Sequence, residues 1–420
     1  MEKDSFYKID GKTVLYQLIH LKQIVFEVTD ACNLRCKYCA YSDLYEGYDE
    51  RKNEYLPFEK ARMIIEYLAD IWKNNTSTSL IEPVAVSFYG GEPLMNMKFI
   101  KEVIDYVNHL EGMNKKFFFS MTTNAMLLDR YMDYLAEKEF RLLISLDGDE
   151  QGNSYRVDSS VKNSFGRVIK NVKLLQVTYP EYFDKLVQFN SVLHNRNSVY
   201  GTYHFIKDVF SKKTRIAPLN NSGIKKDKQE EFWDTYQNMT DSIQKSVNCE
   251  SLQTELFISN PETSVLLNYI NTETGNVYDN YIDLLIDTKK QAYSPTGTCP
   301  PFFKKMFITV NGKILQCEKI NHEFAVGYIS DNKVEIDLDK VAKQQNDFVF
   351  RYQKQCSVCA LKKKCPQCVF QIDSINNSCT KCLSYISKPA QAKHEQSVFN
   401  YLRKHPELYG RIMKEVRVSH

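Results

Sequence analysis

The chain of 420 residues lacks any long run of apolar residues, and its first residues, Met1 to Thr13, are polar and charged. The first absence excludes a membrane-spanning helix, which needs roughly 20 consecutive apolar residues. The second excludes a secretory signal, which has an apolar centre. We therefore expect a cytoplasmic protein with no membrane partner.

A strong charge of one sign is also missing. The 55 Lys and Arg residues against 52 Asp and Glu residues leave a formal net charge of +3. Such a balance provides no basic footprint for nucleic acid, so we expect no nucleic-acid partner. Internal repeats and low-complexity segments are absent, and 43% apolar residues predict a globular chain with one large core and a smaller one.

Cysteine, in contrast, is abundant, with twelve residues in the chain. Without an export signal, the chain is expected in a reducing cytosol, where disulfides are rare. Clustered thiols in that compartment more often bind metals, so the cysteine pattern becomes the main functional signal.

The region from Gln23 to Leu219 alternates short β-forming runs with longer amphipathic runs, as repeated βα units do. The expected strands are Ile24 to Val28, Val84 to Tyr89, Phe117 to Thr122, Phe140 to Leu146, Leu186 to Leu193 and Thr214 to Pro218. The expected helices are Phe58 to Asn74, Met97 to Leu110, Leu128 to Lys138, Ser164 to Gln176 and Ser198 to Ser211. Because such units form parallel sheets by right-handed crossovers, we predict an α/β fold with a partial (β/α)6 TIM-like barrel. Its chemistry should lie at the carboxyl ends of the strands.

The predicted domain organisation has five parts. They are an N-terminal extension (1–22), the barrel (23–219), a helical linker or insert (220–297), a small cysteine-rich domain (298–386) and a helical tail (387–420). A domain as small as the fourth part needs metal sites to stabilise it, since it cannot build a sufficient core.

Three cysteines, Cys32, Cys36 and Cys39, follow the first predicted strand at C-x3-C-x2-C spacing. Three thiolates can bind three irons of a cubane cluster and leave the fourth iron open for catalysis. A structural zinc site is a weaker alternative, because it needs four ligands in two pairs. Buried free thiols are a second alternative, since cysteine often serves as a small core residue.

The segment CNLRCKYC after one strand, followed by Gly90-Gly91-Glu92-Pro93 after the next, resembles the radical S-adenosylmethionine (SAM) superfamily. This resemblance implies that the open iron of a 4Fe-4S cluster binds SAM. It also implies reductive cleavage of SAM to a 5'-deoxyadenosyl radical, chemistry that the cofactors supply and the protein positions.

The same resemblance implies a SAM pocket at the ends of the strands. The candidates are Gly90, Gly91 and Glu92 for the methionine amino group, Thr123, Asn124, Ser145 and Asp147 for the ribose or carboxylate, Arg156 for the carboxylate, Tyr38 near the adenine, and Asn190. Each of these residues could equally be ordinary turn or strand-end chemistry. Ala125 stands where the family often has glycine.

The carboxyl-terminal cysteines resemble a SPASM domain, which carries two auxiliary 4Fe-4S clusters. The resemblance assigns Cys356, Cys359, Cys365 and Cys382 to a distal cluster, and Cys299, Cys317 and Cys368 to a nearer one, with Cys379 or an open iron completing it. The C-x2-C pairs would also suit a zinc-binding module. Cys249 is expected to be an ordinary thiol.

Enzymes with this architecture act mainly on ribosomally made peptides, so the resemblance implies a peptide maturase that forms a thioether or carbon-carbon crosslink. An anaerobic sulfatase-maturing enzyme, which makes formylglycine, is the alternative. In that family an aspartate base follows the cysteine equivalent to Cys317, and here Glu318 stands there, either as a proton acceptor or as a surface residue. A non-catalytic metal-bound scaffold that binds peptides is the third possibility, and release of 5'-deoxyadenosine would exclude it.

The expected partners are a precursor peptide and a reductant such as flavodoxin or ferredoxin. Many peptide maturases have a leader-binding domain before the barrel, and the segment from Met1 to Gln23 is too short to form one. A separate leader-binding protein, or the insert and carboxyl-terminal helices, would then bind the peptide.

Overall fold

The computed structural model describes residues 6–75, 81–257, 261–274, 295–362, 365, 367–372, 381–382 and 384–415. The chain forms two compact units. One, here called the barrel unit, contains Ile9–Asn238 and Cys299–Asn346. The other, here called the cysteine-rich unit, contains Met1–Lys8, Met239–Thr298 and Asp347–His420. No helix in the described part of the chain is long and apolar enough to cross a membrane.

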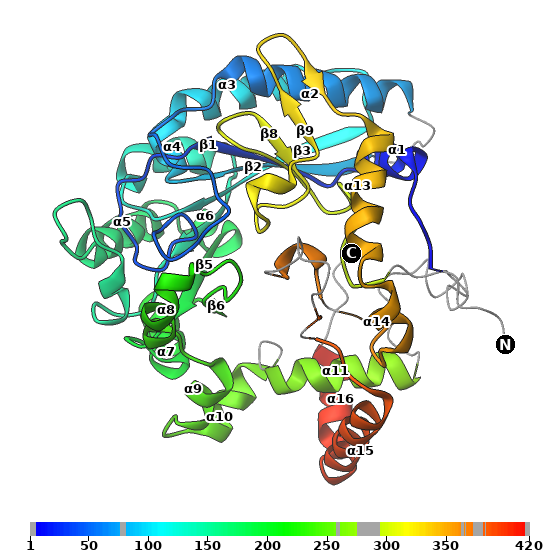
Figure 1. The fold of residues 1–420 in the computed structure, drawn as a ribbon. Helices are drawn as coiled ribbons and strands as arrows, with labels where there is room; N and C mark the ends of the chain where they lie inside the picture. The colour runs from blue at the N-terminus through cyan, green and yellow to red at the C-terminus, as the bar shows by residue number, and fades with distance from the viewer. Residues whose placement is uncertain are drawn as a thin grey trace. The chain divides into compact units, whose positions relative to one another are not determined.

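The barrel unit is built on six parallel strands in sequence order, as predicted (Figure 1). The strands are β1 (Gln23–Thr29), β2 (Glu82–Gly90), β3 (Lys115–Thr123), β4 (Arg141–Ser145), β5 (Val187–Leu193) and β6 (Thr214–Pro218). The helices of this unit are α1 (Gly11–Ile19), α2 (Phe58–Asn74), α3 (Met97–Asn108), α4 (Leu128–Glu137), α5 (Phe165–Thr178), α6 (Pro180–Leu186), α7 (Val199–Phe210) and α8 (Gln229–Thr235). The α/β fold with an open parallel sheet is therefore confirmed.

The sheet continues beyond β1 into the segment that follows Cys299. There, β7 (Met306–Ile308) pairs parallel with β1, and β8 (Lys313–Leu315), β9 (Gly327–Ile329) and β10 (Val334–Glu335) continue antiparallel. Figure 1 shows the yellow β8 and β9 beside the blue and cyan strands. The predicted domain boundaries placed this segment in the small cysteine-rich domain (298–386). In the structure the segment belongs to the barrel unit, because β7 pairs with β1 and extends that edge of the sheet.

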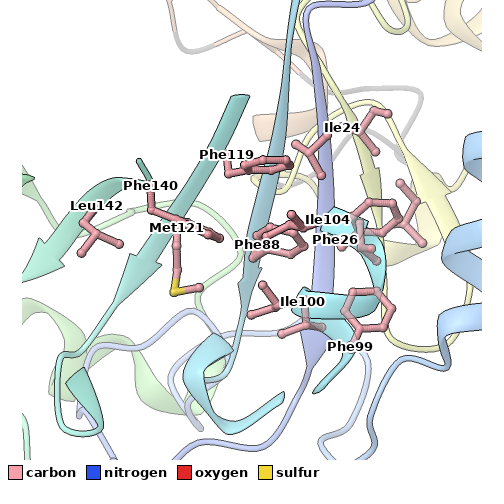
Figure 2. Packing of buried hydrophobic residues seen from close by; sticks show 14 of the residues in the cluster. Ile24, Phe26, Phe88, Phe99, Ile100, Ile104, Phe119, Met121, Phe140 and Leu142 are labelled. Carbon is pink, nitrogen blue, oxygen red and sulfur yellow. The ribbon is translucent and has the colours of Figure 1, made fainter. Parts of the chain in front are cut away.

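The core of the barrel unit lies between the sheet and its helices. Aromatic residues of successive strands project to the same side, where they meet α3 (Figure 2). The rings of Phe26 and Phe99 are 5.8 Å apart, and the Phe140 ring lies 5.9 Å from Phe88 and 5.8 Å from Phe119. Burying each such side chain contributes up to about 3 kcal/mol. This face anchors the strands, and the opposite face is left for polar residues.

The cysteine-rich unit is mainly helical where it is described. Its helices are α9 (Met239–Gln244), α10 (Cys249–Glu255), α11 (Pro261–Thr274), α14 (Gln353–Val358), α15 (Lys388–Lys404) and α16 (Pro406–Glu415), and α13 (Leu338–Phe350) spans the boundary between the units. A small apolar cluster joins Phe257, Leu266 and Ile270 to Val398 of α15 and Ile412 of α16. The predicted insert and tail thus share one core.

Candidate active site

The three cysteines of the C-x3-C-x2-C motif lie in the loop after β1, at the carboxyl end of the sheet. Two backbone hydrogen bonds fix this loop to the segment after β4. Arg35 N donates to Val157 O at 2.6 Å, and Lys37 N donates to Tyr155 O at 3.3 Å. The loop is therefore held from across the sheet as well as from its own strand.

The three cysteines of this loop are partly buried and lie close enough to influence one another. Burial raises the pKa of Cys32 to about 11 and that of Cys36 to about 12, and the charges of neighbouring motif cysteines add to both shifts. Thiolate must form before iron can bind, so cluster binding would release these protons. Iron would then supply the positive charge that buried thiolates need.

Each of the three sulfurs has at least one N–H donor within reach. Leu34 N donates to Cys32 Sγ at 3.4 Å, Arg156 Nη1 approaches Cys36 Sγ at 4.0 Å, and Arg51 Nη2 approaches Cys39 Sγ at 3.5 Å. Such contacts to sulfur are a normal outer shell of iron-sulfur ligands. The donor set therefore fits a 4Fe-4S cluster.

A single metal ion is bound differently from a cubane. In the described residues, no three His, Cys, Asp or Glu side chains are grouped to hold one ion. Cubane thiolates each bind a different iron, so they need not converge on one point. Cys32, Cys36 and Cys39 thus remain the predicted cluster ligands.

The loop after β2 contacts the backbone just before Cys32. Gly91 N donates to Thr29 O at 2.8 Å, and Glu92 N donates to Ala31 O at 2.9 Å. A Cβ atom on Gly91 would lie 1.9 Å from Ala31 O, and Gly90 has a φ of +129°. Glycine is required here because the two backbone segments approach too closely for a Cβ atom. Gly90 and Gly91 thus have a structural role in addition to their predicted contact with SAM.

The Glu92 carboxylate links the ends of β2 and β3. It accepts hydrogen bonds from Thr123 Oγ1 at 2.6 Å, Asn124 N at 2.7 Å and Leu94 N at 3.1 Å. Burial raises the pKa of Glu92 to about 7, although these hydrogen bonds act in the opposite direction. Glu92 therefore positions Thr123 and Asn124 rather than projecting freely into a pocket.

Asn124 brings the end of β3 to the cysteine loop. Its Nδ2 donates to Asn33 Oδ1 at 2.7 Å and lies 3.8 Å from Cys32 Sγ. The next residue, Ala125, has a φ of +60°. That left-handed conformation explains why glycine suits this position in related sequences.

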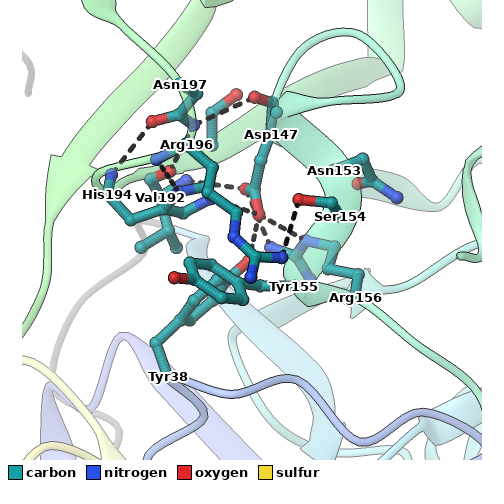
Figure 3. Close-up of polar contacts among 12 residues, drawn as sticks. Tyr38, Asp147, Asn153, Ser154, Tyr155, Arg156, Val192, His194, Arg196 and Asn197 are labelled. Atoms are coloured by element: carbon teal, nitrogen blue, oxygen red, sulfur yellow. Dashed lines mark hydrogen bonds and ion pairs between the residues drawn. The ribbon is translucent and has the colours of Figure 1, made fainter. Parts of the chain in front are cut away.

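A second polar group surrounds Asp147, just after β4 (Figure 3). Arg156 donates to its carboxylate through Nε at 2.9 Å and Nη2 at 3.1 Å, Val192 N donates at 2.8 Å, and the Tyr38 hydroxyl also donates. Burial alone would raise the pKa of Asp147, but the Arg156 guanidinium and the hydrogen bonds outweigh it and lower the pKa to about 2. Asp147 and Arg156 are therefore both ionised and form an ion pair.

Asp147 and Arg156, both predicted to contact SAM, bind each other in this structure, and their contacts with SAM stay predictions. Both Asp147 oxygens accept hydrogen bonds from protein donors. Arg156 forms its bidentate pair with Asp147, which leaves only Nη1 to face the cysteine loop. The sequence did not predict this pairing, because no pattern along the chain indicates that an acid and a base nine residues apart contact each other.

His194 belongs to the same group and was not predicted. Its ring is completely buried and stacks on Tyr38 with centroids 5.4 Å apart. Its Nδ1 accepts from Arg196 N at 3.2 Å, while Nε2 lies 3.7 Å from Asp147 Oδ2 and has no hydrogen-bond partner in the described residues. No motif marks this histidine, because it reaches the site from the loop after β5.

Ser145 and Asn190 are neighbours across β4 and β5. They lie on the face opposite Ile144 and Phe189, which belong to the core between sheet and helices. Paired residues of parallel strands point to the same face, so the two polar side chains share the open face of the sheet. The structure thus brings these two candidates together.

Glu318 lies beside Cys317, shortly after β8. Burial alone would raise the pKa of Glu318, but the ammonium of Lys305, 3.0 Å away, outweighs it and lowers the pKa. Burial raises the pKa of Tyr48 and of Tyr89, and the charges of Cys39 and Glu318 add to both shifts. With 17% of its side chain exposed, Glu318 is not an ordinary surface residue.

The four cysteines predicted to bind the distal cluster lie near one another in the cysteine-rich unit. Burial raises the pKa of Cys356 to about 11, and the charges of Cys365, Cys382 and Cys359 add to the shift. Cys356 lies in α14, and Cys382 N donates to Gln355 Oε1 of the same helix at 3.0 Å. The charges of these cysteines therefore act on one another over a span of 27 residues, from Cys356 to Cys382, and the ligand set stays a prediction.

The predicted ligands of the nearer cluster are divided between the two units. Cys299 and Cys317 belong to the barrel unit and Cys368 to the cysteine-rich unit, and Cys379 lies outside the described residues. This ligand set stays a prediction. Cys249 begins α10 and is a free cysteine.

Comparison with known proteins agrees with the site. Residues 26–180 match the model of the Radical SAM superfamily. The chain is 22% identical to the cysteine-type anaerobic sulfatase-maturating enzyme of Clostridium novyi, over 81% of this chain and 85% of that protein. It is 26% identical to the radical SAM cyclopropyl synthase TigE of Paramaledivibacter caminithermalis, over 54% of this chain and 46% of that protein.

A solved structure shares the fold. Native anSMEcpe with bound AdoMet and Cp18Cys peptide superposes with a TM-score of 0.59 at 18% identity, covering 94% of this chain and 99% of that one. The chain therefore contains a radical SAM domain, matched at residues 26–180, and is an enzyme. Its implied cofactors are SAM and a 4Fe-4S cluster.

Proposed function

We propose that this enzyme is a peptide maturase that modifies a side chain of a ribosomally made precursor peptide, most simply by a thioether or carbon-carbon crosslink. The observation that carries the proposal is the ionised Glu318, whose charge acts on the same two tyrosines, Tyr48 and Tyr89, as Cys39 does. A proton acceptor near the cysteine loop suits an oxidation that removes hydrogen from a substrate. The similarity to TigE and to sulfatase maturases supports the same class.

When bound, the cluster and SAM would supply a 5'-deoxyadenosyl radical that takes a hydrogen atom from the substrate. The substrate must then lose one electron and one proton to close a new bond. Glu318 would accept the proton, and Lys305, 3.0 Å away, would keep Glu318 ionised beforehand. An auxiliary cluster would accept the electron.

Two auxiliary clusters complete the proposal. The closeness of Cys356, Cys359, Cys365 and Cys382 supports the distal one. Cys299, Cys317, Cys368 and either Cys379 or an open iron would hold the nearer one. A flavodoxin or ferredoxin would reduce the enzyme, and a separate leader-binding protein could deliver the peptide.

Formylglycine formation is the second candidate. Its support is the place of Glu318 directly after Cys317, where sulfatase maturases have an aspartate base, together with the similarity to the Clostridium novyi enzyme. The substrate would then be a cysteine or serine side chain of a sulfatase peptide. The two candidates use the same base and differ in substrate and product.

The test offers the reduced enzyme two peptides with SAM. One is a precursor peptide encoded beside the gene, and the other is a sulfatase peptide with its cysteine. Mass spectrometry distinguishes a crosslink, which removes two hydrogens, from an aldehyde that replaces the thiol. Deuterium moving from the peptide into 5'-deoxyadenosine identifies the hydrogen removed. Cleavage of SAM with neither peptide changed would contradict both candidates.

The role of Glu318 is tested by Glu318→Gln, with the exposed Glu323→Gln as the matched control. We expect Glu318→Gln to cleave SAM but to lower peptide product by about 100-fold, since a general base contributes at least that much. Glu323→Gln should behave as wild type. Unchanged product from Glu318→Gln would remove this residue from the mechanism.

A further inference from the structure

Arg51 lies outside every motif of the sequence, in the segment between the cysteine loop and α2. Its guanidinium Nη2 is 3.5 Å from Cys39 Sγ, and the group lies over the Tyr41 ring, 4.4 Å from its centroid. The Tyr41 hydroxyl in turn donates to Glu27 Oε1 at 2.6 Å. Arg51 is therefore packed against the predicted cluster ligand rather than extended into solvent.

The backbone around Arg51 is fixed in place. Asp30, two residues before Cys32, accepts from Lys52 N at 2.7 Å through Oδ2 and from Glu54 N at 2.6 Å through Oδ1. The same segment that ends β1 thus holds both the cysteine loop and the residues following Arg51. The contact between Arg51 and Cys39 is set by the scaffold.

No carboxylate of the described residues forms an ion pair with Arg51, but its charge acts on the buried Glu27 carboxylate beside Tyr41. The Nε of Arg51 is buried without a hydrogen-bond partner in the described part of the chain. Arg156, the other arginine near the motif sulfurs, has its charge balanced by Asp147 at 2.9 Å. Arg51 thus brings a positive charge and a buried Nε donor without a hydrogen-bond partner to the cysteine loop.

A positive charge beside cluster thiolates has a definite consequence. Reduction adds one negative charge to the cluster, and a nearby cation and N–H···S hydrogen bonds stabilise that charge. Net charge and hydrogen bonding to sulfur are known determinants of iron-sulfur potentials. The geometry points to Arg51 as a residue that tunes the reduction potential of the cluster held by Cys39, making its reduction easier.

This inference rests on the 4Fe-4S cluster and does not depend on which substrate the enzyme modifies. Arg51 would act through Cys39, so it is a positioning and tuning residue rather than a catalytic one. Its effect should appear in the cluster itself before any substrate is added.

The experiment is a redox titration of the loaded enzyme followed by electron paramagnetic resonance. The cluster to follow is the one whose signal changes when SAM is added. Arg51→Gln removes the charge, and Arg51→Lys keeps it without the planar donor. Arg35→Gln is the matched control, because Arg35 lies in the cysteine loop but its Nη1 donates to Cys32 O at 3.0 Å, a backbone carbonyl.

We expect Arg51→Gln to lower the ratio of reduced to oxidised cluster by about tenfold at a fixed potential, equal to about 59 mV for one electron. Arg51→Lys should lie between Arg51→Gln and wild type, and Arg35→Gln should match wild type within about twofold. Iron content should be equal in all four proteins. An unchanged potential in Arg51→Gln, or a loss of iron from it, would overturn the proposal.

A change confined to the KM for peptide would also overturn it, because it would assign Arg51 to substrate binding. Failure of the proposed maturase activity leaves this result untouched, since the titration contains no peptide.

Discussion

Glu92 and Asp147 occupy equivalent places at the ends of β2 and β4, and both carboxylates are buried, yet their pKa values move in opposite directions. Burial dominates at Glu92, whose partners Thr123, Asn124 and Leu94 are neutral, and the pKa rises to about 7. At Asp147 the guanidinium of Arg156 reverses the effect of burial, and the pKa falls to about 2.

The difference shows two ways of supporting the same cysteine loop. Neutral hydrogen bonds fix the Cys32 side through Glu92 and Asn124, and an ion pair fixes the Cys36 side through Asp147 and Arg156. A buried ion pair tolerates poorly the loss of either partner. The Glu92 carboxyl, which has only neutral donors and a pKa of about 7, instead changes its charge with pH near neutrality.

The largest effect is expected from Arg156→Met, which breaks the ion pair. Asp147 would be left buried and uncompensated, at a cost of about 3–5 kcal/mol in the free energy of unfolding. Urea denaturation of the anaerobic protein measures this. The double variant with Asp147→Asn should recover part of the loss, because it removes the stranded charge. A double variant no more stable than Arg156→Met would contradict the account.

Next in size is Gly91→Ala, which disturbs the Glu92 side through the backbone. Its Cβ would lie 1.9 Å from Ala31 O, so the cysteine loop must shift, costing about 3 kcal/mol. Iron content after reconstitution should fall. Gly166→Ala, where a Cβ would meet nothing within 4 Å, is the control and should keep its iron. Full iron loading of Gly91→Ala would show that the loop does not need this close approach.

The smallest effect is a pH dependence that belongs to Glu92. Since the pKa of Glu92 is about 7 in the folded protein and its ordinary value is 4.5, the folded state binds more protons than the unfolded state between these limits. Stability from this group is therefore present below pH 4.5 and is lost as pH rises towards 7, by up to about 1.4 kcal/mol per pH unit.

Glu92→Gln should remove this slope, whatever its absolute stability. Urea unfolding at pH 5, 6 and 7 measures it, with the exposed Glu111→Gln as control. An identical slope in Glu92→Gln and wild type would mean that the buried Glu92 carboxyl does not titrate in this range.

Much of the fold could be predicted from the sequence because the signals were local. The helix Phe58–Asn74 and the strand Thr214–Pro218 were predicted with the bounds that the structure has, since hydrophobic spacing decides both. The place of β7 to β10 was missed, because an extension of the β1 edge depends on pairing between residues some 280 positions apart, such as Ile24 and Met306.

The site was predicted in composition but not in its internal pairing. Cys32, Cys36 and Cys39 were predicted from their spacing, and the loop at Gly91 was predicted from the family resemblance. The pairing of Arg156 with Asp147, the stacking of His194 on Tyr38 and the approach of Arg51 to Cys39 depend on three-dimensional contacts. No residue pattern along the chain marks them.

The measurement that tests the account most directly is SAM cleavage by the anaerobically reconstituted enzyme under dithionite. Wild type is compared with the variant in which Cys32, Cys36 and Cys39 are all replaced by alanine, with iron counted in both. We predict that wild type releases 5'-deoxyadenosine, and that the variant releases none and has lost about four irons, one cubane cluster. Equal cleavage by the two proteins, or equal iron, would contradict the assignment of the cluster to these three thiols.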